Sequence, residues 1–332
     1  MSNNSETMKA LVLTEYNKDY ELQEITKPIP NSNQVLVRIK ASAINPLDVK
    51  IKAGTAAHSH TTLPAILGLD MAGVVEAVGS EVINFKPGDE VYGMTGGVGG
   101  IQGSLAEYAA VDPDLLALKP ATLTMKEAAA LPLAFITAWE GLIEKGNLSV
   151  GQMLLIQGGS GSVGHVAIQI AIAKGAKVFA TGSSKNLAMI ESYGATAIDY
   201  TKIKPEEYIN LANGDGFDVI LDTAGGEDMG KLFEAVKVHT GHVVSILGRG
   251  SYNLTPLSLR GASYSGVMTL TPLITGIDRK RQGAIMQQAT MLADAGKLKP
   301  FVDATSYTFE SITAAYQAFE NHTAAGKVVI DI

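Results

Sequence analysis

The 332-residue sequence predicts an α/β protein that combines a β-rich part with a doubly wound parallel sheet. Residues 8–125 contain short β-like runs, such as VLVRIKA and AGVVEAVG, separated by turn clusters like FKPGDE. From Met153 to about Leu270, apolar strand-like runs alternate with helical segments, which is typical of a parallel sheet covered by helices on both faces. Because a chain of this length usually exceeds one hydrophobic core, two domains are expected.

The individual elements of the second part can be placed from the same pattern. The strand-like runs include MLLIQ, KVFATGS, DVILDTA, HVVSILG and SYSGVMTL. Helices are predicted over 162–174, 185–193, 205–213 and 228–237. The final segment carries a long amphipathic stretch over 279–300 and ends in a strand-like run, KVVIDI.

The composition excludes several classes of function. The chain has no cysteine, which removes disulfides, thiolate metal ligands and a cysteine nucleophile, and which fits a reducing cytosol. The formal net charge is -7 and no run of Lys or Arg forms a basic patch, so nucleic acid is not an expected partner. No apolar run approaches the roughly 18 residues of a membrane span. We therefore expect a soluble, cytoplasmic protein.

A glycine-rich turn lies between the first strand-like run and the first helix of the second part. In QGGSGSVG, over 157–164, the residues Gly159, Gly161 and Gly164 form the pattern G-x-G-x-x-G. Such a turn lets the backbone bend tightly and lets a pyrophosphate approach the N-terminus of the helix. Glycine-rich turns also arise from packing alone, but the strand before and the helix after favour a dinucleotide site.

The end of the next strand indicates which dinucleotide is bound. In the NAD-binding form, an acidic residue about 20 positions beyond the turn accepts hydrogen bonds from the ribose hydroxyls. Here the strand KVFATGSSKN ends in Ser183, Ser184 and Lys185, without Asp or Glu. Hydroxyls and an ammonium suit a 2′-phosphate, so the sequence predicts NADPH. An alternative role of Ser183 is to cap the helix that begins near Lys185.

Four further stretches carry a family resemblance: ASAINPLDVKIKAG (41–54), GLDMAGVVEAVGSEV (68–82), FKPGDEVYG (85–93) and FDVILDTAGG (217–226). With the glycine turn, they make nearly the whole chain similar to the medium-chain dehydrogenase/reductase superfamily, and within it to the zinc-free quinone oxidoreductase branch. The resemblance implies a GroES-like substrate domain over 1–128 and 275–332 and a Rossmann dinucleotide-binding domain over 129–274. It also implies an active-site cleft where the two domains meet.

The same resemblance shows which metal ligands are missing. Zinc-dependent members have a cysteine where this chain has Asn45, and a His-Glu pair where it has Leu69 and Asp70. Neither Asn45 nor Leu69 is a credible zinc ligand, so no metal is expected. Without a metal Lewis acid, hydride delivery to an acceptor that is already electrophilic, such as a quinone or an enone, is the easier reaction.

Asn45, Asp48 and Lys50 are the catalytic candidates. The resemblance places Asn45 near the nicotinamide, where its amide could donate to the acceptor oxygen as charge develops there. A turn role ahead of Pro46 is the alternative. Asp48 and Lys50 follow in the same segment, but many relatives have a tyrosine at the place of Lys50 or shortly beyond, so the proton donor stays open.

The resemblance also implies a set of cofactor contacts. Thr137 corresponds to a hydroxyl residue near the nicotinamide end, and Lys185 and Tyr200 fall in the register of the 2′-phosphate pocket. His322 lies where some relatives use an arginine for the same phosphate. The full expected set is Asn45, Thr137, Gly159, Ser160, Gly161, Val163, Gly164, Ser183, Ser184, Lys185, Tyr200, Leu247, Val267 and His322.

The sequence thus predicts an NADPH-dependent reductase of quinones or α,β-unsaturated carbonyls. A non-catalytic NADPH-binding protein of the same fold, structural or regulatory, is the alternative. The run SYSGVMTLTPL would supply the last strand of the Rossmann sheet, and such an exposed edge is usually covered or paired. Because the resembled family pairs this edge with its twin across a two-fold axis, we expect a homodimer.

Overall fold

The structure is a computed structural model that describes residues 6–226, 229–248 and 250–332. It divides the chain into two compact units. Unit 1 is formed by Met1–Leu133 and Leu270–Ile332, and unit 2 by Ala134–Thr269. The helix α3 (Pro132–Trp139) carries the chain from unit 1 into unit 2.

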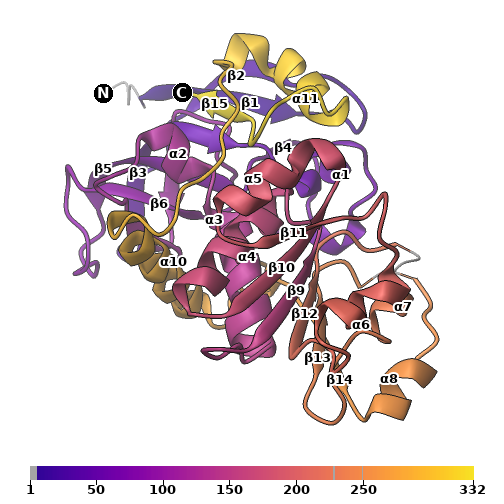
Figure 1. The fold of residues 1–332 in the computed structure, drawn as a ribbon. Coiled ribbons are helices and arrows are strands. Elements are labelled where there is room, and N and C mark those ends of the chain that lie inside the picture. Colours follow the sequence, from indigo (N-terminus) through magenta and orange to yellow (C-terminus); the bar gives the residue numbers. More distant parts are fainter. Residues whose placement is uncertain (1–5, 227–228, 249) are drawn as a thin grey trace, which may run out of the picture. The chain divides into compact units, whose positions relative to one another are not determined.

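Unit 2 is built around a parallel sheet whose strands follow the order β11-β10-β9-β12-β13-β14 (Figure 1). The chain begins in the middle of this sheet, adds strands on one side and then returns to add strands on the other. That order is the doubly wound topology expected from the alternating sequence, and it confirms the predicted fold class. The strands are β9 (Met153–Gln157), β10 (Lys177–Gly182), β11 (Thr196–Asp199), β12 (Val219–Asp222), β13 (His242–Ser245) and β14 (Ser263–Gly266).

The helices of unit 2 are shorter than the sequence predicts, except for α4 (Ser162–Ala173), which lies almost over its predicted range. The next two predicted helices each begin with a single 3₁₀ turn. These segments are the turn Ser184–Asn186 before α5 (Leu187–Ser192) and the turn Pro205–Glu207 before α6 (Tyr208–Leu211). A π-helical turn, Glu140–Lys145, continues α3, and α8 (Thr255–Arg260) precedes β14.

The helix predicted over 228–237 is wrong beyond its first turn. Only α7 (Met229–Leu232) is helical, and Asp228 lies outside the described residues. The reason is a short parallel bridge: the Phe217 N–H donates to the Ala235 carbonyl and the Lys237 N–H donates to the Phe217 carbonyl, each over 2.9 Å. Backbone groups committed to a neighbouring extended segment cannot form i to i−4 bonds as well.

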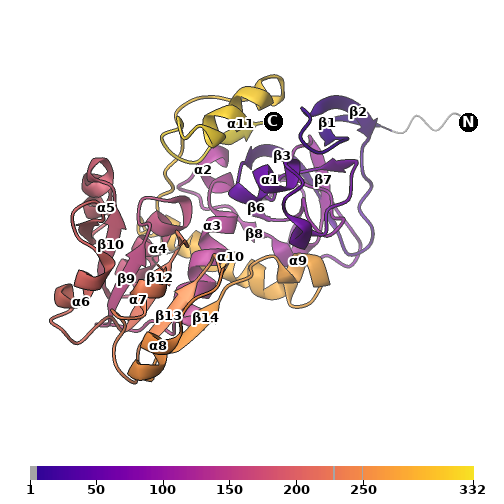
Figure 2. The ribbon, with the colours of Figure 1, turned by 90° about the vertical axis from the view of Figure 1, so that its right-hand side faces the viewer.

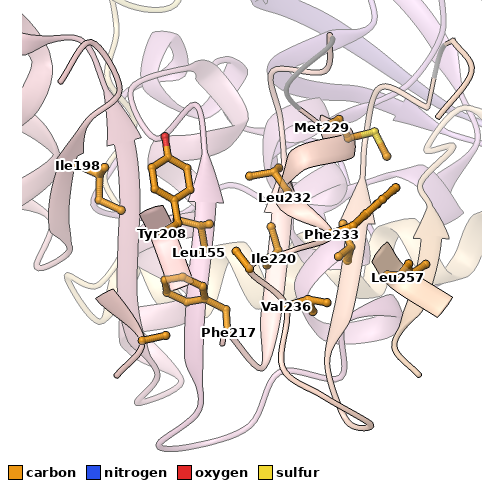
Figure 3. Close-up of a cluster of buried hydrophobic side chains, with 13 residues drawn as sticks. Leu155, Ile198, Tyr208, Phe217, Ile220, Met229, Leu232, Phe233, Val236 and Leu257 are labelled. Carbon is orange, nitrogen blue, oxygen red and sulfur yellow. The ribbon is translucent and has the colours of Figure 1, made fainter. Parts of the chain in front are cut away.

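One face of the unit 2 sheet is covered by a buried apolar cluster (Figure 3). Leu155, Ile220 and Val243 come from adjacent strands and point to this face, where α6 and α7 supply Tyr208 and Leu232. Because parallel strands are buried on both faces, their sequences are apolar at nearly every position rather than alternating. This burial fixes the sheet and therefore the positions at which its strands end.

Unit 1 is β-rich. Its main sheet follows the order β15-β3-β5-β6-β8, with β7 also paired to β3, and a smaller sheet follows the order β2-β1-β4. The strands β1 and β2 lie side by side in Figure 2 and pair antiparallel. The strand bounds are β1 (Thr7–Leu13), β2 (Glu21–Thr26), β3 (Val35–Ala43), β4 (Ala65–Ile66), β5 (Asp70–Val78), β6 (Glu90–Met94), β7 (Tyr108–Val111), β8 (Ala117–Leu118) and β15 (Val329–Asp331).

The two parts of unit 1 that are distant in sequence meet in this sheet, because β15 from the chain end pairs antiparallel with β3. The helices are α1 (Pro46–Lys52), α2 (Met125–Ala129), α9 (Thr271–Thr275), α10 (Arg279–Asp294) and α11 (Ile312–Glu320), with 3₁₀ turns at Ala57–Ser59, Pro113–Leu115 and Phe309–Ser311. Within the part of the chain that the structure describes, we find no helix long and apolar enough to cross a membrane.

Candidate functional site

The glycine turn at the end of β9 is anchored by hydroxyl groups from both neighbouring strands. Gly158 has a positive φ of 83°, and its N–H donates to Thr181 Oγ1 over 2.9 Å. The Gly159 N–H donates to the Thr181 carbonyl over 2.8 Å, and Thr223 Oγ1 donates to the Gln157 carbonyl over 2.6 Å. The turn is therefore held rigidly before any ligand arrives.

The three glycines of the motif serve different purposes. A Cβ on Gly159 would lie 2.7 Å from Ala180 Cβ, and a Cβ on Gly164 would lie 2.1 Å from the Gly158 carbonyl oxygen. Both positions need glycine for the protein's own packing. A Cβ on Gly161 would meet only the Gly158 oxygen, at 3.4 Å, so packing does not require glycine there. The bare position at Gly161 leaves room for an atom group that the protein itself does not supply.

Gly161 is also the N-cap of α4, a helix of 12 residues. The first N–H groups of a helix, here those of Ser162 and Val163, have no acceptor within the helix, and a glycine cap has no side chain to accept them. Beside the turn, Asn186 Nδ2 donates to Ser160 Oγ over 3.1 Å. N–H groups without an acceptor inside the helix, a helix N-terminus and space at Gly161 are what a pyrophosphate needs, so these residues fit a dinucleotide.

The turn lies where the order of the sheet reverses, between β9 and β12, at the carboxyl ends of the strands. Leu247 and Val267 follow β13 and β14 at the same edge. The sequence did not single out Asp222, whose Oδ1 accepts from the Gly225 N–H (2.8 Å) and whose Oδ2 accepts from Ser245 Oγ (2.8 Å). Ser245 Oγ in turn accepts from the Leu247 N–H over 3.1 Å, so this buried pair shapes two of the edge loops.

Four of the residues expected around a 2′-phosphate lie at one corner of the same edge. Ser183, Ser184 and Lys185 directly follow β10, and Tyr200 directly follows the neighbouring strand β11. Ser183 occupies the N-cap position of a 3₁₀ turn, but its side chain makes no capping hydrogen bond. The tertiary structure adds a residue that the sequence reading missed, because Asp199 at the end of β11 accepts a hydrogen bond from Ser184 Oγ over 2.6 Å.

Two further expected cofactor contacts, Thr137 and His322, belong to different units. In unit 2, Thr137 is buried, and its hydroxyl lies 3.1 Å from that of Thr269. Thr269 Oγ1 donates to Glu140 Oε2 over 3.2 Å, so its hydrogen is used, and Thr137 is the donor of the pair. The oxygen of Thr137 can still accept a hydrogen bond. His322 belongs to unit 1, where it lies on an exposed turn after α11 with a φ of 53°.

In unit 1, Asn45 is at the centre of a buried polar cluster. Its Nδ2 donates to Asp70 Oδ2 over 3.0 Å and to the Ala43 carbonyl over 3.3 Å. Its Oδ1 accepts from Lys327 Nζ, which also lies 3.8 Å from Asp70 Oδ2. Asn45 is fully buried and its amide hydrogens have acceptors within unit 1. This arrangement does not leave the amide available to donate to a substrate oxygen, which is the role that the sequence suggested.

The cluster instead organises the start of α1. Asn45 is the N-cap of this helix, and its backbone N–H donates to Asp48 Oδ2 over 2.8 Å. Asp48 is buried, whereas Lys50, two residues further on, is partly exposed. Of the three catalytic candidates, Lys50 alone combines a charge with exposed surface. Lys327 was not identified as a site residue from the sequence. The signal that could have shown its burial is its position directly before the apolar run VVI.

Burial dominates the electrostatics of this cluster. It raises the pKa of Asp48 to about 7, and the Asp70 carboxylate nearby adds to the rise. Burial also raises the pKa of Asp70 and lowers the pKa of Lys327, while the attraction between their opposite charges opposes both changes. Inside unit 1, the Lys327 ammonium therefore donates to the Asn45 amide oxygen and lies near the Asp70 carboxylate.

Candidate metal ligands do not gather elsewhere in the described ranges 6–226, 229–248 and 250–332, where no group of three or more His, Asp or Glu could hold a metal ion. The acceptor atom of Asn45 is already bonded to Lys327, and Leu69 offers only carbon. The doubly wound sheet, with a glycine turn at the N-terminus of α4, is the architecture of the dinucleotide-binding class of proteins.

Comparison with known proteins identifies the family. Residues 31–121 match the family model of the alcohol dehydrogenase GroES-like domain, and residues 193–330 match that of the zinc-binding dehydrogenases. The chain is 38% identical to the tomato (Solanum lycopersicum) 2-methylene-furan-3-one reductase over 97% of its length and 79% of that protein. It is 36% identical to a chloroplastic NADPH-dependent alkenal/one oxidoreductase of Arabidopsis thaliana, with the same two coverages, and 31% identical to the pig (Sus scrofa) quinone oxidoreductase over 92% of each chain.

A solved structure agrees with these relatives. An alcohol dehydrogenase superfamily protein from Novosphingobium aromaticivorans superposes with a TM-score of 0.96 at 48% identity, covering 98% of this chain and 100% of the other. The chain belongs to the medium-chain dehydrogenase/reductase superfamily of oxidoreductases, in its zinc-free quinone oxidoreductase-like branch. The family predicted from the sequence is therefore confirmed.

The raised pKa of Asp48 predicts a pH-dependent stability. Folding raises this pKa from 3.8 to about 7, so the contribution of Asp48 to stability is fully present below about pH 4 and is lost as the pH rises through 7. Asp48→Asn keeps an oxygen that can accept from the Asn45 N–H but carries no charge. The variant should gain about 1–3 kcal/mol relative to the wild type between pH 5 and pH 8. Urea unfolding of both proteins at the two pH values measures this gain, and an equal difference at pH 5 and pH 8 would contradict it.

Proposed function

We propose that this protein is an NADPH-dependent, zinc-independent reductase that delivers a hydride to a quinone or an α,β-unsaturated carbonyl. The observation that carries the proposal is the glycine turn at the carboxyl edge of the unit 2 sheet, where Gly161 has no side chain and caps the N-terminus of α4. The names of the tomato, Arabidopsis and pig relatives support the acceptor class. In this proposal unit 2 binds the cofactor, unit 1 supplies the residues that act on the acceptor, and the protein works in the cytoplasm.

The cofactor, when bound, supplies the hydride. The chain's own groups would hold it: the turn from Gly159 to Gly164 at the pyrophosphate, Lys185 and Tyr200 at the adenosine end, and Leu247 and Val267 along the edge of the sheet. The free acceptor capacity of Thr137 suits a carboxamide N–H. NADPH is proposed over NADH because Lys185 adds a positive charge where a 2′-phosphate would lie.

Zinc independence rests on the residues themselves. Asn45 stands where a zinc site would need a thiolate, and its side-chain oxygen accepts from the Lys327 ammonium. Leu69 stands where such a site would need a histidine, and its side chain offers only carbon. The reaction then depends on an acceptor that needs no metal to become electrophilic. As charge collects on its oxygen, a nearby cation or hydrogen-bond donor stabilises it.

The first test is consumption of NADPH with a panel of acceptors: a naphthoquinone, an ortho-quinone, an alkenal and an enone. We expect oxidation of NADPH with at least one acceptor, at a rate that a zinc chelator leaves unchanged, because no group of three or more His, Asp or Glu among the described residues could hold a metal ion. Absorbance at the nicotinamide band measures the rate, and elemental analysis measures bound zinc. If NADPH binds but no acceptor is reduced, the protein is a non-catalytic member of its family.

Within unit 1, we propose that Lys50 acts on the acceptor oxygen and that Asn45 and Asp48 position it. Asn45 and Asp48 are buried at the start of α1 and bonded to each other through the Asn45 N–H, whereas Lys50 on the same helix is partly exposed. An ammonium can stabilise the developing negative charge and can also release a proton to it. Asn45 acts indirectly, because it holds both the helix start and Lys327.

Lys50→Met should lower kcat by roughly 10- to 1000-fold, the range for losing one preorganised charge or donor, while the affinity for NADPH stays the same. Lys52→Met is the matched control, since Lys52 is a lysine on the same helix and is likewise partly exposed. Steady-state kinetics and an NADPH titration on both variants check the prediction. Equal kcat values for the two variants would remove Lys50 from the reaction.

We also propose a homodimer formed through β14. This strand ends the order of the unit 2 sheet and pairs only with β13 among the described residues, and its Tyr264 is 37% exposed. An unpaired strand edge invites pairing with a second copy.

Light scattering at micromolar concentration should return twice the 34.8 kDa of one chain. Ser263→Lys places a positive charge on the exposed start of β14. It should weaken the dimer, because the like charges of the two copies would repel each other across the two-fold axis. Ser251→Lys, in an exposed loop, is the control. A mass near that of one chain for the wild type would exclude the dimer.

A further inference from the structure

The corner formed by the ends of β10 and β11 contains a carboxylate as well as the groups expected to attract a phosphate. Asp199 is 7% exposed, and its Oδ2 accepts from Ser184 Oγ over 2.6 Å. Its Oδ1 accepts from Thr201 Oγ1 over 2.6 Å and from the Thr201 N–H over 3.0 Å. These hydrogen bonds, first that of Ser184 and then those of Thr201, hold the pKa of Asp199 well below its usual range, so the group is charged.

This contact decides what Ser184 can do. A hydroxyl has one hydrogen, and in Ser184 that hydrogen points to Asp199, so the oxygen can only accept further hydrogen bonds. A phosphate offers acceptor oxygens and would meet only lone pairs at Ser184. A ribose 2′-hydroxyl can donate and would find an acceptor there. This geometry therefore suits a ribose 2′-hydroxyl at Ser184 better than the phosphate that the sequence analysis expected there.

The charges at the corner oppose each other. Lys202 Nζ lies 3.3 Å from Asp199 Oδ2 on a side chain that is 71% exposed, and Lys185 follows Ser184 in the chain. The lysines favour a 2′-phosphate, whereas the Asp199 carboxylate repels it. The NAD-binding pattern places its acidic residue at the end of the strand equivalent to β10, and here the neighbouring strand β11 brings an acidic side chain to the same corner.

We propose that Asp199 is a specificity-determining residue that holds the Ser184 hydroxyl as an acceptor for a ribose 2′-hydroxyl and limits the preference for NADPH over NADH. The proposal rests on the proposed function, since it requires a dinucleotide at this edge of the sheet. It predicts a protein that binds both cofactors, with a preference for NADPH that is smaller than Lys185 alone would give.

Binding of the adenosine half of the cofactor tests this without any reaction. Calorimetry with 2′-phospho-ADP-ribose and with ADP-ribose gives the ratio of the two affinities. Asp199→Asn removes the negative charge and keeps an acceptor for Ser184, so it should raise the ratio by about tenfold, mainly through tighter binding of the phosphorylated fragment. Asp215→Asn removes the same charge from an exposed loop and should leave the ratio within about twofold of the wild type.

A second variant covers the case in which Asp199→Asn does not fold. Ser184→Ala removes the acceptor but leaves the carboxylate, so it should weaken ADP-ribose binding by about three- to tenfold and change binding of the phosphorylated fragment less. If the wild type binds both fragments and neither variant changes the ratio, Asp199 does not set the preference and the proposed function stands. If the wild type binds neither fragment, NADPH or NADH, the proposed function and this inference both fail.

Discussion

The constraint on which unit 2 depends is the contact between the start of α4 and the turn after β9. Helix and turn can meet only because Gly164 has no side chain: a Cβ there would lie 2.1 Å from the Gly158 carbonyl oxygen. That contact points the N-terminus of α4 at the reversal of the sheet, where the first N–H groups of the helix lie beside Gly161. The proposed pyrophosphate site is thus a consequence of the close packing of Gly164 against the Gly158 carbonyl oxygen. The hydroxyls of Thr181 and Thr223 fix the same turn from the two neighbouring strands.

Unit 1 depends on a buried cation in a similar way. An ammonium out of water is costly unless it is paired and hydrogen-bonded, and Lys327 has both the Asn45 oxygen and the Asp70 carboxylate. Asp70 Oδ1 also accepts from the Leu133 N–H over 2.9 Å, in the first turn of α3. The cluster therefore ties the chain end, the start of α1 and the start of α3 together within unit 1. The side chains of Asn45 and Asp70 are thus used for bonding within unit 1.

The polar cluster around Asn45 in unit 1 and the polar groups around Asp199 in unit 2 differ in which hydrogen-bonding atoms they leave available to a ligand. In unit 1 the amide hydrogens of Asn45 have internal acceptors, so the buried groups support their neighbours, whereas Lys50 of α1 is partly exposed. In unit 2 the hydroxyl of Ser184 donates its hydrogen to Asp199, so the Ser184 oxygen can only accept further hydrogen bonds. The direction of a hydrogen bond, and not only the type of residue, decides which ligand group a side chain can recognise.

The sequence by itself determined the fold class, the doubly wound sheet and the position of the glycine turn between β9 and α4, since each of these follows from a local pattern of apolar runs and glycines. Local patterns could not show that Asp199 reaches Ser184, 15 positions earlier, or that Lys327 bonds to Asn45 across 282 positions. The helix predicted to reach residue 237 ended early because Phe217, just before β12, pairs with the backbone of Ala235 and Lys237. Only tertiary structure decided these points, because the burial of a polar group and the direction of its hydrogen bonds depend on partners that strand pairing brings together.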